Sequence, residues 1–237
     1  MVAPVAVVLG VGSGLGSAVA RQFARQGYAV ALMARTLEHL TPIEQEIKQL
    51  GETAISVEVD ATDAVKITEA FTEVRATLGT PEVLVYNAGM LQIGGILELT
   101  PEQFEQGWKV NCFGAFLAAQ QVLPAMLEQA KGTIIFTGAT AAIRGSARFS
   151  ALAVGKFGLR ALAQSIAREF GSQGIHVAHV IIDGLIDTPR VREMFSQREA
   201  NTLILPDAIA ETYWQLHQQP STAWTLELDL RPASEKF

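Results

Sequence analysis

Three glycines near the start of the chain have the spacing of a phosphate-binding turn. The segment "GVGSGLG" fits the pattern G-x-x-x-G-x-G at Gly10, Gly14 and Gly16. Glycine permits a tight turn and close approach of a pyrophosphate, and the helix that follows directs free N–H groups at the phosphates. A glycine-rich turn without function is the alternative, but this one follows an apolar strand and precedes a helix. We interpret it as a dinucleotide-binding loop, with expected contacts at Gly10, Gly12, Ser13, Gly14, Leu15 and Gly16.

The next apolar strand ends in "ALMAR", which places the neutral Ala34 and then Arg35 at its end. An acid at this point holds the ribose 2′-hydroxyl of NAD, whereas a guanidinium suits the 2′-phosphate of NADP. We therefore expect NADP as the cofactor and regard NAD as less favoured. Ser13 could add a hydrogen bond to the phosphate. A solvated surface arginine is the alternative interpretation.

The elements that must position these residues alternate along the chain. Fully apolar strands followed by helices indicate a parallel sheet covered on both faces, with ligands at the carboxyl ends of the strands. We expect a single doubly wound, Rossmann-like α/β sheet of about seven strands, and one domain over residues 1–237. The predicted strands are 5–9, 29–33, 54–59, 82–86, 133–137, 175–182 and 224–230. The predicted helices are 15–26, 37–50, 63–78, 101–129, 150–170 and 207–217.

Composition narrows the class of protein. The chain has 237 residues, a net charge of −6, 49% apolar residues and 18% charged residues, which suits a folded domain and argues against disorder. The negative charge argues against nucleic acid as a partner, because phosphates bind clustered Lys and Arg. The single cysteine, Cys112, excludes an internal disulfide and fits a reducing compartment. Without a signal-peptide pattern or an apolar run of membrane length, we expect a cytoplasmic protein with no membrane contact.

Three further motifs follow the glycine loop in order. They are "VDATD" at 59–63, "YNAG" at 86–89 and "VNCFG" at 110–114. Together with the loop, they resemble the short-chain dehydrogenase/reductase family over nearly the whole chain. The resemblance implies an oxidoreductase that transfers a hydride between a nicotinamide cofactor and a small molecule. It also implies a homodimer or homotetramer, because the family commonly forms both.

The resemblance implies a role for each matching position. Lys156 is expected to hold the nicotinamide ribose, and Asn111 to hold a water and orient that lysine. In the segment "DGLIDTP", at 183–189, the expected cofactor contacts are Gly184 and Thr188. The other expected contacts border the adenine and its ribose, and they are Asp60, Ala61, Asn87, Ala88 and Gly89.

Two positions of the family's catalytic set hold other residues. The usual Tyr-x-x-x-Lys is here Leu152-x-x-x-Lys156, within "SARFSALAVGKFGLRAL", and the usual serine is Ala139. The tyrosine gives a proton to the carbonyl oxygen, which is worth about a hundredfold to ten-thousandfold in rate. The serine holds that oxygen, and losing such a donor costs about 3–4 kcal/mol. Smaller departures from the family pattern are Leu9, Tyr86 and Asp183, the last in place of a proline.

Few polar groups near this gap could replace the lost donors. Thr140 follows the serine position and could donate a hydrogen bond, although a structural turn hydroxyl is an equally good interpretation. Lys156 and Asn111 could relay a proton through water. The expected catalytic residues are therefore Asn111, Lys156 and Thr140. The expected substrate pocket is apolar, and its wall comprises Ala139, Leu152, Leu185, Ile186 and Met194.

Other reactive side chains do not form a recognisable site. His176 and His179 are three residues apart on a predicted strand, so they point to opposite faces and cannot share a metal. Cys112 has no accompanying histidine motif and is interpreted as a packed helix cysteine. Arg144 and Arg148 lie in the loop beside the expected pocket, as surface charges or as ligands of an anionic substrate. We expect no metal site.

Two functions remain open from the sequence. The first is an NADP-dependent oxidoreductase with an altered acid, acting on a small apolar carbonyl, imine or conjugated substrate. The retained Lys156, Asn111 and glycine loop favour it. The second is a non-catalytic nucleotide-binding sensor or assembly protein, which is favoured by the apolar residues Leu152 and Ala139 in the reaction site. The sequence favours the enzyme and does not identify its substrate.

Overall fold

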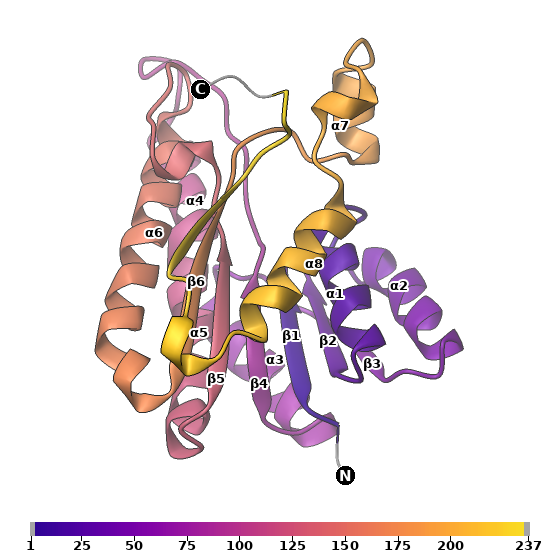
Figure 1. Cartoon of the computed structure of the whole chain (residues 1–237). Helices are drawn as coiled ribbons and strands as arrows, with labels where there is room; N and C mark the ends of the chain where they lie inside the picture. Colours follow the sequence, from indigo (N-terminus) through magenta and orange to yellow (C-terminus); the bar gives the residue numbers. More distant parts are fainter. Residues whose placement is uncertain (1–2, 235–237) are drawn as a thin grey trace.

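A single parallel sheet organises the chain in the computed structural model, which describes residues 3–234 (Figure 1). The strand order is β3-β2-β1-β4-β5-β6-β7, so the predicted doubly wound fold is confirmed. Residues 1–2 and 235–237 of the predicted domain lie outside the described part. The strands are β1 (Val5–Leu9), β2 (Ala29–Ala34), β3 (Ala54–Glu58), β4 (Pro81–Tyr86), β5 (Gly132–Thr137), β6 (Ile175–Ile182) and β7 (Glu227–Leu230).

Helices cover both faces of the sheet (Figure 1). One layer holds α1 (Leu15–Arg25), α2 (Leu37–Gln49) and α8 (Pro206–His217). The other holds α3 (Ala64–Thr77), α4 (Pro101–Trp108), α5 (Gly114–Glu128) and α6 (Ser150–Phe170). A short helix that the sequence pattern did not predict, α7 (Pro189–Met194), stands beyond the carboxyl ends of the strands.

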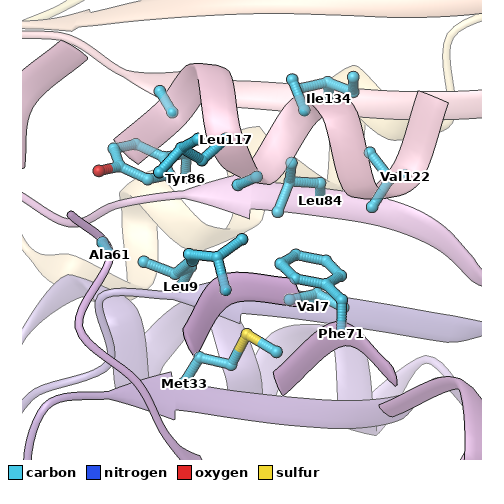
Figure 2. Close-up of a cluster of buried hydrophobic side chains, with 14 of the residues drawn as sticks. Val7, Leu9, Met33, Ala61, Phe71, Leu84, Tyr86, Leu117, Val122 and Ile134 are labelled. Atoms are coloured by element: carbon cyan, nitrogen blue, oxygen red, sulfur yellow. The ribbon is translucent and has the colours of Figure 1, made fainter. Parts of the chain in front are cut away.

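The side-chain alternation of the strands separates two apolar cores. Val5, Val7 and Leu9 of β1 face the α3–α5–α6 layer, whereas Ala6 and Val8 face the α1–α2–α8 layer. Because both sets are buried, the strands read as continuous apolar runs in the sequence. Figure 2 shows the first core, in which β1, β2 and β4 meet the helices that cover them.

The predicted helix over 101–129 is interrupted. Residues Lys109–Phe113 form a π-helical turn between α4 and α5. Such turns often mark functional sites because they turn a side chain out of the regular helical series. This one contains Asn111, which is fully buried. Residues Pro101–Glu128 form the one stretch in the described chain with the length and apolarity of a membrane span. Half of its most apolar 18-residue segment is buried inside the domain, where α5 packs into the core.

The last strand is shorter than predicted. Residues Ser221–Ala223 form a 3₁₀ turn, and β7 begins only at Glu227. The Trp224 indole N–H donates to the Gln219 carbonyl at 3.1 Å, which holds this residue in a turn before the strand. The apolar pattern from Trp224 onward therefore predicted the strand correctly but misplaced its start.

Candidate active site

The glycine loop and the end of β4 form one closely packed unit. Gly10 has φ +100°, and a Cβ atom there would lie 2.2 Å from the Ala88 nitrogen. A Cβ on Gly16 would lie 2.5 Å from the Gly10 oxygen. The Asn87 side-chain amide donates to that same oxygen at 2.8 Å. Thus Asn87 and Ala88 hold the shape of the loop, and only glycine fits at Gly10 and Gly16.

The loop presents an uncapped helix N-terminus. Gly14 is the N-cap of α1 and offers no side chain to the first N–H groups. The Ser17 hydroxyl donates to the Gly14 oxygen at 2.8 Å instead of accepting from those groups. Free N–H groups at a helix start form a ready anion site. Gly12 has no heavy atom within 4 Å of its Cβ position, and Ser13 is exposed, so this part of the loop is open to a ligand.

The segment after β6 closes over the glycine loop. A Cβ on Gly14 would lie 2.5 Å from the Thr188 Cγ2 atom. Thr188 is fixed there as the N-cap of α7, because its hydroxyl accepts from the Val191 N–H at 3.2 Å. Gly184 has φ +154°, and its Cβ position lies 2.9 Å from the Pro232 Cδ atom. The structure therefore places Thr188 directly against the loop.

A pocket of about 400 Å³ lies at the carboxyl ends of β2 and β3. Arg35 and Asp60, both expected from the sequence, line it together with Glu58, Val59 and Lys66. The Asp60 carboxylate accepts from the Thr62 N–H and hydroxyl, both at 2.8 Å, which fixes its orientation. Sequence reasoning did not include Glu58 or Lys66 in this site. For Glu58 the signal is strand register, because Glu58 pairs with Ala34, next to Arg35.

Lys156 and Asn111 meet in the buried centre of the site. The Lys156 ammonium donates to the Thr137 carbonyl at 2.7 Å, and burial lowers its pKa to about 8. The Asn111 amide donates to the carbonyls of Met90 and Gly107, both at 2.9 Å. A Cβ on Gly89 would lie 3.4 Å from Asn111 Oδ1 and 3.7 Å from Lys156 Nζ. Both side chains therefore border Gly89.

The positions of the expected apolar wall are dispersed over three segments. Ala139 is partly buried just before a 3₁₀ turn, Thr140–Ala142, and Leu152 is partly buried in the first turn of α6. Ile186 is partly buried and forms an isolated bridge with Ile204. Met194, at the end of α7, is 50% exposed. Leu185 is partly buried beside Ile204, whose N–H donates to the Leu185 carbonyl at 2.9 Å.

Asp183 is a site residue that sequence reasoning missed. It was noted only as a departure from the family's proline, yet its carboxylate accepts a hydrogen bond from the Thr140 hydroxyl. The Arg231 guanidinium lies 3.3 Å from the same carboxylate. The signal for the pair lies in the sheet register, since Thr137 pairs with Val180. Thr140 and Asp183 each lie three residues beyond these partners, so β5 and β6 bring them together at the carboxyl ends of the strands.

The remaining candidates have structural partners. His176 stacks on Trp224 with ring centroids 5.0 Å apart, whereas His179 faces Glu227, with 3.7 Å between Nδ1 and Oε2. Burial raises the pKa of the Cys112 thiol, which makes it a poor nucleophile. Arg148 forms a two-point ion pair with Glu98 at 2.8 and 2.9 Å. Within residues 3–234, no three His, Cys, Asp or Glu side chains cluster as a metal site would require.

Known proteins are similar to this chain over most of its length. A family model described as short chain dehydrogenase matches residues 4–199. An uncharacterized oxidoreductase of Staphylococcus saprophyticus is 28% identical over 229 residues, which cover 96% of this chain and 97% of the relative. The 3-oxoacyl-acyl-carrier-protein reductase MabA of Mycobacterium avium is 31% identical over 197 residues, or 83% of this chain and 72% of that protein.

Solved structures agree with the fold described above. A short-chain dehydrogenase from Rhodopseudomonas palustris has a TM-score of 0.85 at 38% identity, covering 98% of this chain and 99% of that one. A metagenomic short-chain oxidoreductase in complex with NADP has a TM-score of 0.85 at 30% identity, covering 99% of both chains. Because the family model matches residues 4–199, which are most of the chain, the protein belongs to the short-chain dehydrogenase family.

Proposed function

We propose that this protein is a single-domain, NADP(H)-binding oxidoreductase that acts on a small apolar carbonyl, imine or conjugated substrate. The observation that carries the proposal is the glycine loop, which is closed by Thr188 and followed by an uncapped helix start. A dinucleotide fits it because Cβ atoms are excluded where the loop packs and free N–H groups remain where phosphates bind. The NADP complex of the metagenomic relative supports the choice of cofactor.

The cofactor, when bound, supplies the hydride of the reaction. In this chain, Arg35 and Lys66 offer positive charge for the 2′-phosphate at the pocket beside Asp60. Lys156 holds the nicotinamide ribose. Expected contacts along the rest of the dinucleotide are the loop residues with Ala61, Asn87, Ala88, Gly89 and Gly184.

We further propose that the site is atypical and works without the family's tyrosine and serine. Lys156 is the proton donor, because its pKa of about 8 places both protonation states near neutral pH. Asn111 and a water connect it to the substrate oxygen. The Thr140 hydroxyl donates to Asp183, so its oxygen is the part that remains available to that water. Leu152 and Ala139 form an apolar wall beside the reacting carbon.

The test of cofactor binding is a titration with NADPH and separately with NADH, followed by energy transfer from tryptophan to the nicotinamide. NADPH is expected to bind in the micromolar range, at least about tenfold tighter than NADH. Arg35→Ala should weaken NADPH about tenfold and leave NADH unchanged, because a charge-assisted contact to phosphate is worth about 1.5–3 kcal/mol.

The matched control for that titration is Arg168→Ala. Arg168 lies near the start of β6, at the opposite edge of the sheet from Arg35, and lines a separate pocket. The Arg168→Ala variant should bind both nucleotides as the wild type does. If Arg35→Ala weakens NADH and NADPH equally, the role of Arg35 in 2′-phosphate recognition is contradicted. Failure of the wild type to bind either nucleotide would contradict the proposed function.

A second candidate function is a nucleotide sensor or assembly protein without catalysis. The observation in its favour is that Leu152 and Ala139 offer no hydrogen bond at the two positions where the family places its donors. The double variant Leu152→Tyr, Ala139→Ser separates the two functions.

If the wild type is an enzyme with an altered acid, it reduces some apolar ketone, imine or enone at a measurable rate, and the double variant changes its substrate preference. If the chain is a sensor, only the double variant acquires generic carbonyl reduction, with a gain of about a hundredfold or more. NADPH oxidation at 340 nm, over a panel of the three substrate types, measures both.

The family resemblance also implied a homodimer or homotetramer, and an aromatic surface supports this proposal. Trp108, Phe113 and Phe116 stack in series along α4, the π turn and α5, with centroids 5.5 and 6.2 Å apart. Phe116 is 41% exposed and Phe157 of α6 is 43% exposed. Exposed apolar side chains gathered on neighbouring helices are typical of subunit contacts.

We expect the wild type to sediment as a dimer or tetramer and Phe116→Glu to dissociate it toward monomer, at least about tenfold in the dissociation constant, because burying a charge in an apolar contact is costly. Leu50→Glu is the control, since Leu50 is 58% exposed at the end of α2, in the other helix layer. Analytical ultracentrifugation over a concentration series measures the change. A Phe116→Glu variant that assembles like the wild type would place the interface elsewhere.

The proposed partner is therefore a small molecule, with neither nucleic acid nor membrane involved. The net charge of −6 supports the exclusion of nucleic acid. A cytoplasmic location is proposed because the one cysteine of the sequence, Cys112, fits a reducing compartment. Fractionation of cells that express the tagged chain tests the location.

A further inference from the structure

Asp183 lies between the two groups that flank the proposed nicotinamide site. On one side, it directly precedes Gly184 and the segment that carries Thr188 onto the glycine loop. On the other side, its carboxylate holds the Thr140 hydroxyl, three residues beyond the carbonyl that binds Lys156 Nζ. Asp183 therefore belongs to the edge of the sheet at which the reactive end of the cofactor is expected.

The charge at this edge is only partly neutralised. Arg231 contacts Asp229 with two nitrogens, at 2.5 and 2.9 Å, and Asp183 at 3.3 Å. The three side chains thus carry two negative charges and one positive charge. Arg231 lies closer to Asp229 than to Asp183, so it offsets the charge of Asp183 less than that of Asp229. The side chain of Asp183 is 15% exposed, so solvent screens this charge less than it screens a surface carboxylate.

We propose that Asp183 determines which oxidation state of the cofactor the site prefers, by favouring NADP⁺ over NADPH. The inference rests on the proposed function, because it requires the nicotinamide to lie at this edge. The two cofactor forms differ there by one positive charge, since the oxidised ring is cationic and the reduced ring is neutral. A nearby carboxylate attracts the cation and leaves the neutral ring unaffected. A proline, which is the family's usual residue, offers no such charge.

Thr140 has a positioning role in this arrangement. By donating a hydrogen bond to Asp183, the hydroxyl fixes the rotamer of the carboxylate. The alternative is a purely structural role, in which Asp183 only anchors the C-terminal segment, since its N–H also donates to the Leu230 carbonyl at 2.8 Å. The experiment below separates electrostatic preference from anchoring.

The experiment is calorimetric titration of the full-length protein with NADP⁺ and with NADPH, on the wild type and three variants. Asp183→Asn removes the charge and keeps an oxygen that can accept from Thr140. It should weaken NADP⁺ about three- to tenfold, as expected for one charge at a partly solvated site, and change NADPH less than twofold. Asp183→Glu should retain the wild-type preference. Glu128→Gln, at an exposed carboxylate on the last residue of α5, is the control and should change neither affinity.

Each outcome decides between the alternatives. If Asp183→Asn weakens both cofactor forms equally, or lowers the melting temperature and leaves both affinities unchanged, Asp183 is an anchor and the inference is wrong. If Asp183→Glu loses the preference for NADP⁺ as Asp183→Asn does, the charge of residue 183 is not the cause of that preference. If the wild type binds neither form, the proposed function fails and the inference with it. If it binds both and Asp183→Asn leaves their ratio unchanged, only the inference fails.

Discussion

Replacing Gly10 with alanine is expected to lower the free energy of unfolding by about 2–5 kcal/mol and to abolish nucleotide binding. Two costs combine at this position. An L-residue held at φ +100° is strained by about 1–2 kcal/mol. The added Cβ would also lie 2.2 Å from the Ala88 nitrogen, a backbone atom that cannot rotate away. Forcing the ends of β1 and β4 apart costs about 1–3 kcal/mol more, as overpacking in a core does.

Two other glycines provide matched controls that separate these costs. Gly27 has φ +84° but no heavy atom within 4 Å of its Cβ position, so Gly27→Ala should lose only the strain, about 1–2 kcal/mol. Gly12 has neither a positive φ nor a close neighbour, so Gly12→Ala should change the stability of the free protein by less than about 0.5 kcal/mol.

Urea unfolding of the three variants without nucleotide measures these differences, with unchanged m-values as the check on two-state behaviour. From the most to the least stable, the expected order is Gly12→Ala, Gly27→Ala and Gly10→Ala. If Gly10→Ala is no less stable than Gly27→Ala, the loop is free to move away from Ala88. The close packing of the loop against β4 would then not be what shapes the phosphate site.

The strands and the glycine loop were predictable because each rests on a local signal. The apolar runs of β1 and β6 match the predicted residues at both ends, since both faces of these strands are buried. The glycine loop is shaped by contacts with residues 87 and 88. Because these contacts leave no room for a Cβ atom, they require glycine, and the glycines are visible in the sequence. Propensity and tertiary packing favour the same structure at these positions.

The residues that escaped prediction depend on packing between distant segments. No local pattern distinguishes the π turn at Lys109–Phe113 from regular helix, because the turn contains no proline or glycine that would interrupt one. The Thr140–Asp183 pair depends on the register of β5 and β6. Helix α7 is six residues long and starts at a proline after the Thr188 cap, too short to carry an amphipathic period.

Lys156→Met is expected to have opposite effects on folding and on cofactor binding. In the free protein, Lys156 is buried with a single hydrogen bond, to the Thr137 carbonyl. Burial lowers its pKa to about 8, from 10.5 in the unfolded chain. Holding the charged form below pH 8 therefore costs about 3 kcal/mol, at about 1.36 kcal/mol for each unit of pKa. Methionine removes this cost and forfeits one hydrogen bond from a charged donor, worth about 1.5–3 kcal/mol.

The pH dependence distinguishes this account from a general packing effect. Between pH 8 and 10.5 the unfolded lysine holds a proton that the folded lysine has released, so the stability of the wild type rises with pH across this window. Lys156→Met should be more stable than the wild type at pH 7, by up to about 2 kcal/mol, and lose that advantage by about pH 10. Lys48→Met, at a lysine exposed on α2, should show no such convergence.

The same substitution should weaken NADPH by about tenfold or more, because methionine cannot donate to the ribose hydroxyls and one such charged hydrogen bond is worth about 1.5–3 kcal/mol. A residue retained for packing alone would lose stability and leave binding unaffected. The reverse pattern is a more stable protein that binds nucleotide poorly. It is expected only if Lys156 destabilises the free protein and contributes to ligand binding. Urea unfolding at pH 7 and pH 10, with an NADPH titration of the same samples, decides between the two. A destabilised variant that binds NADPH normally would remove Lys156 from the proposed site, and with it the proposed proton donor.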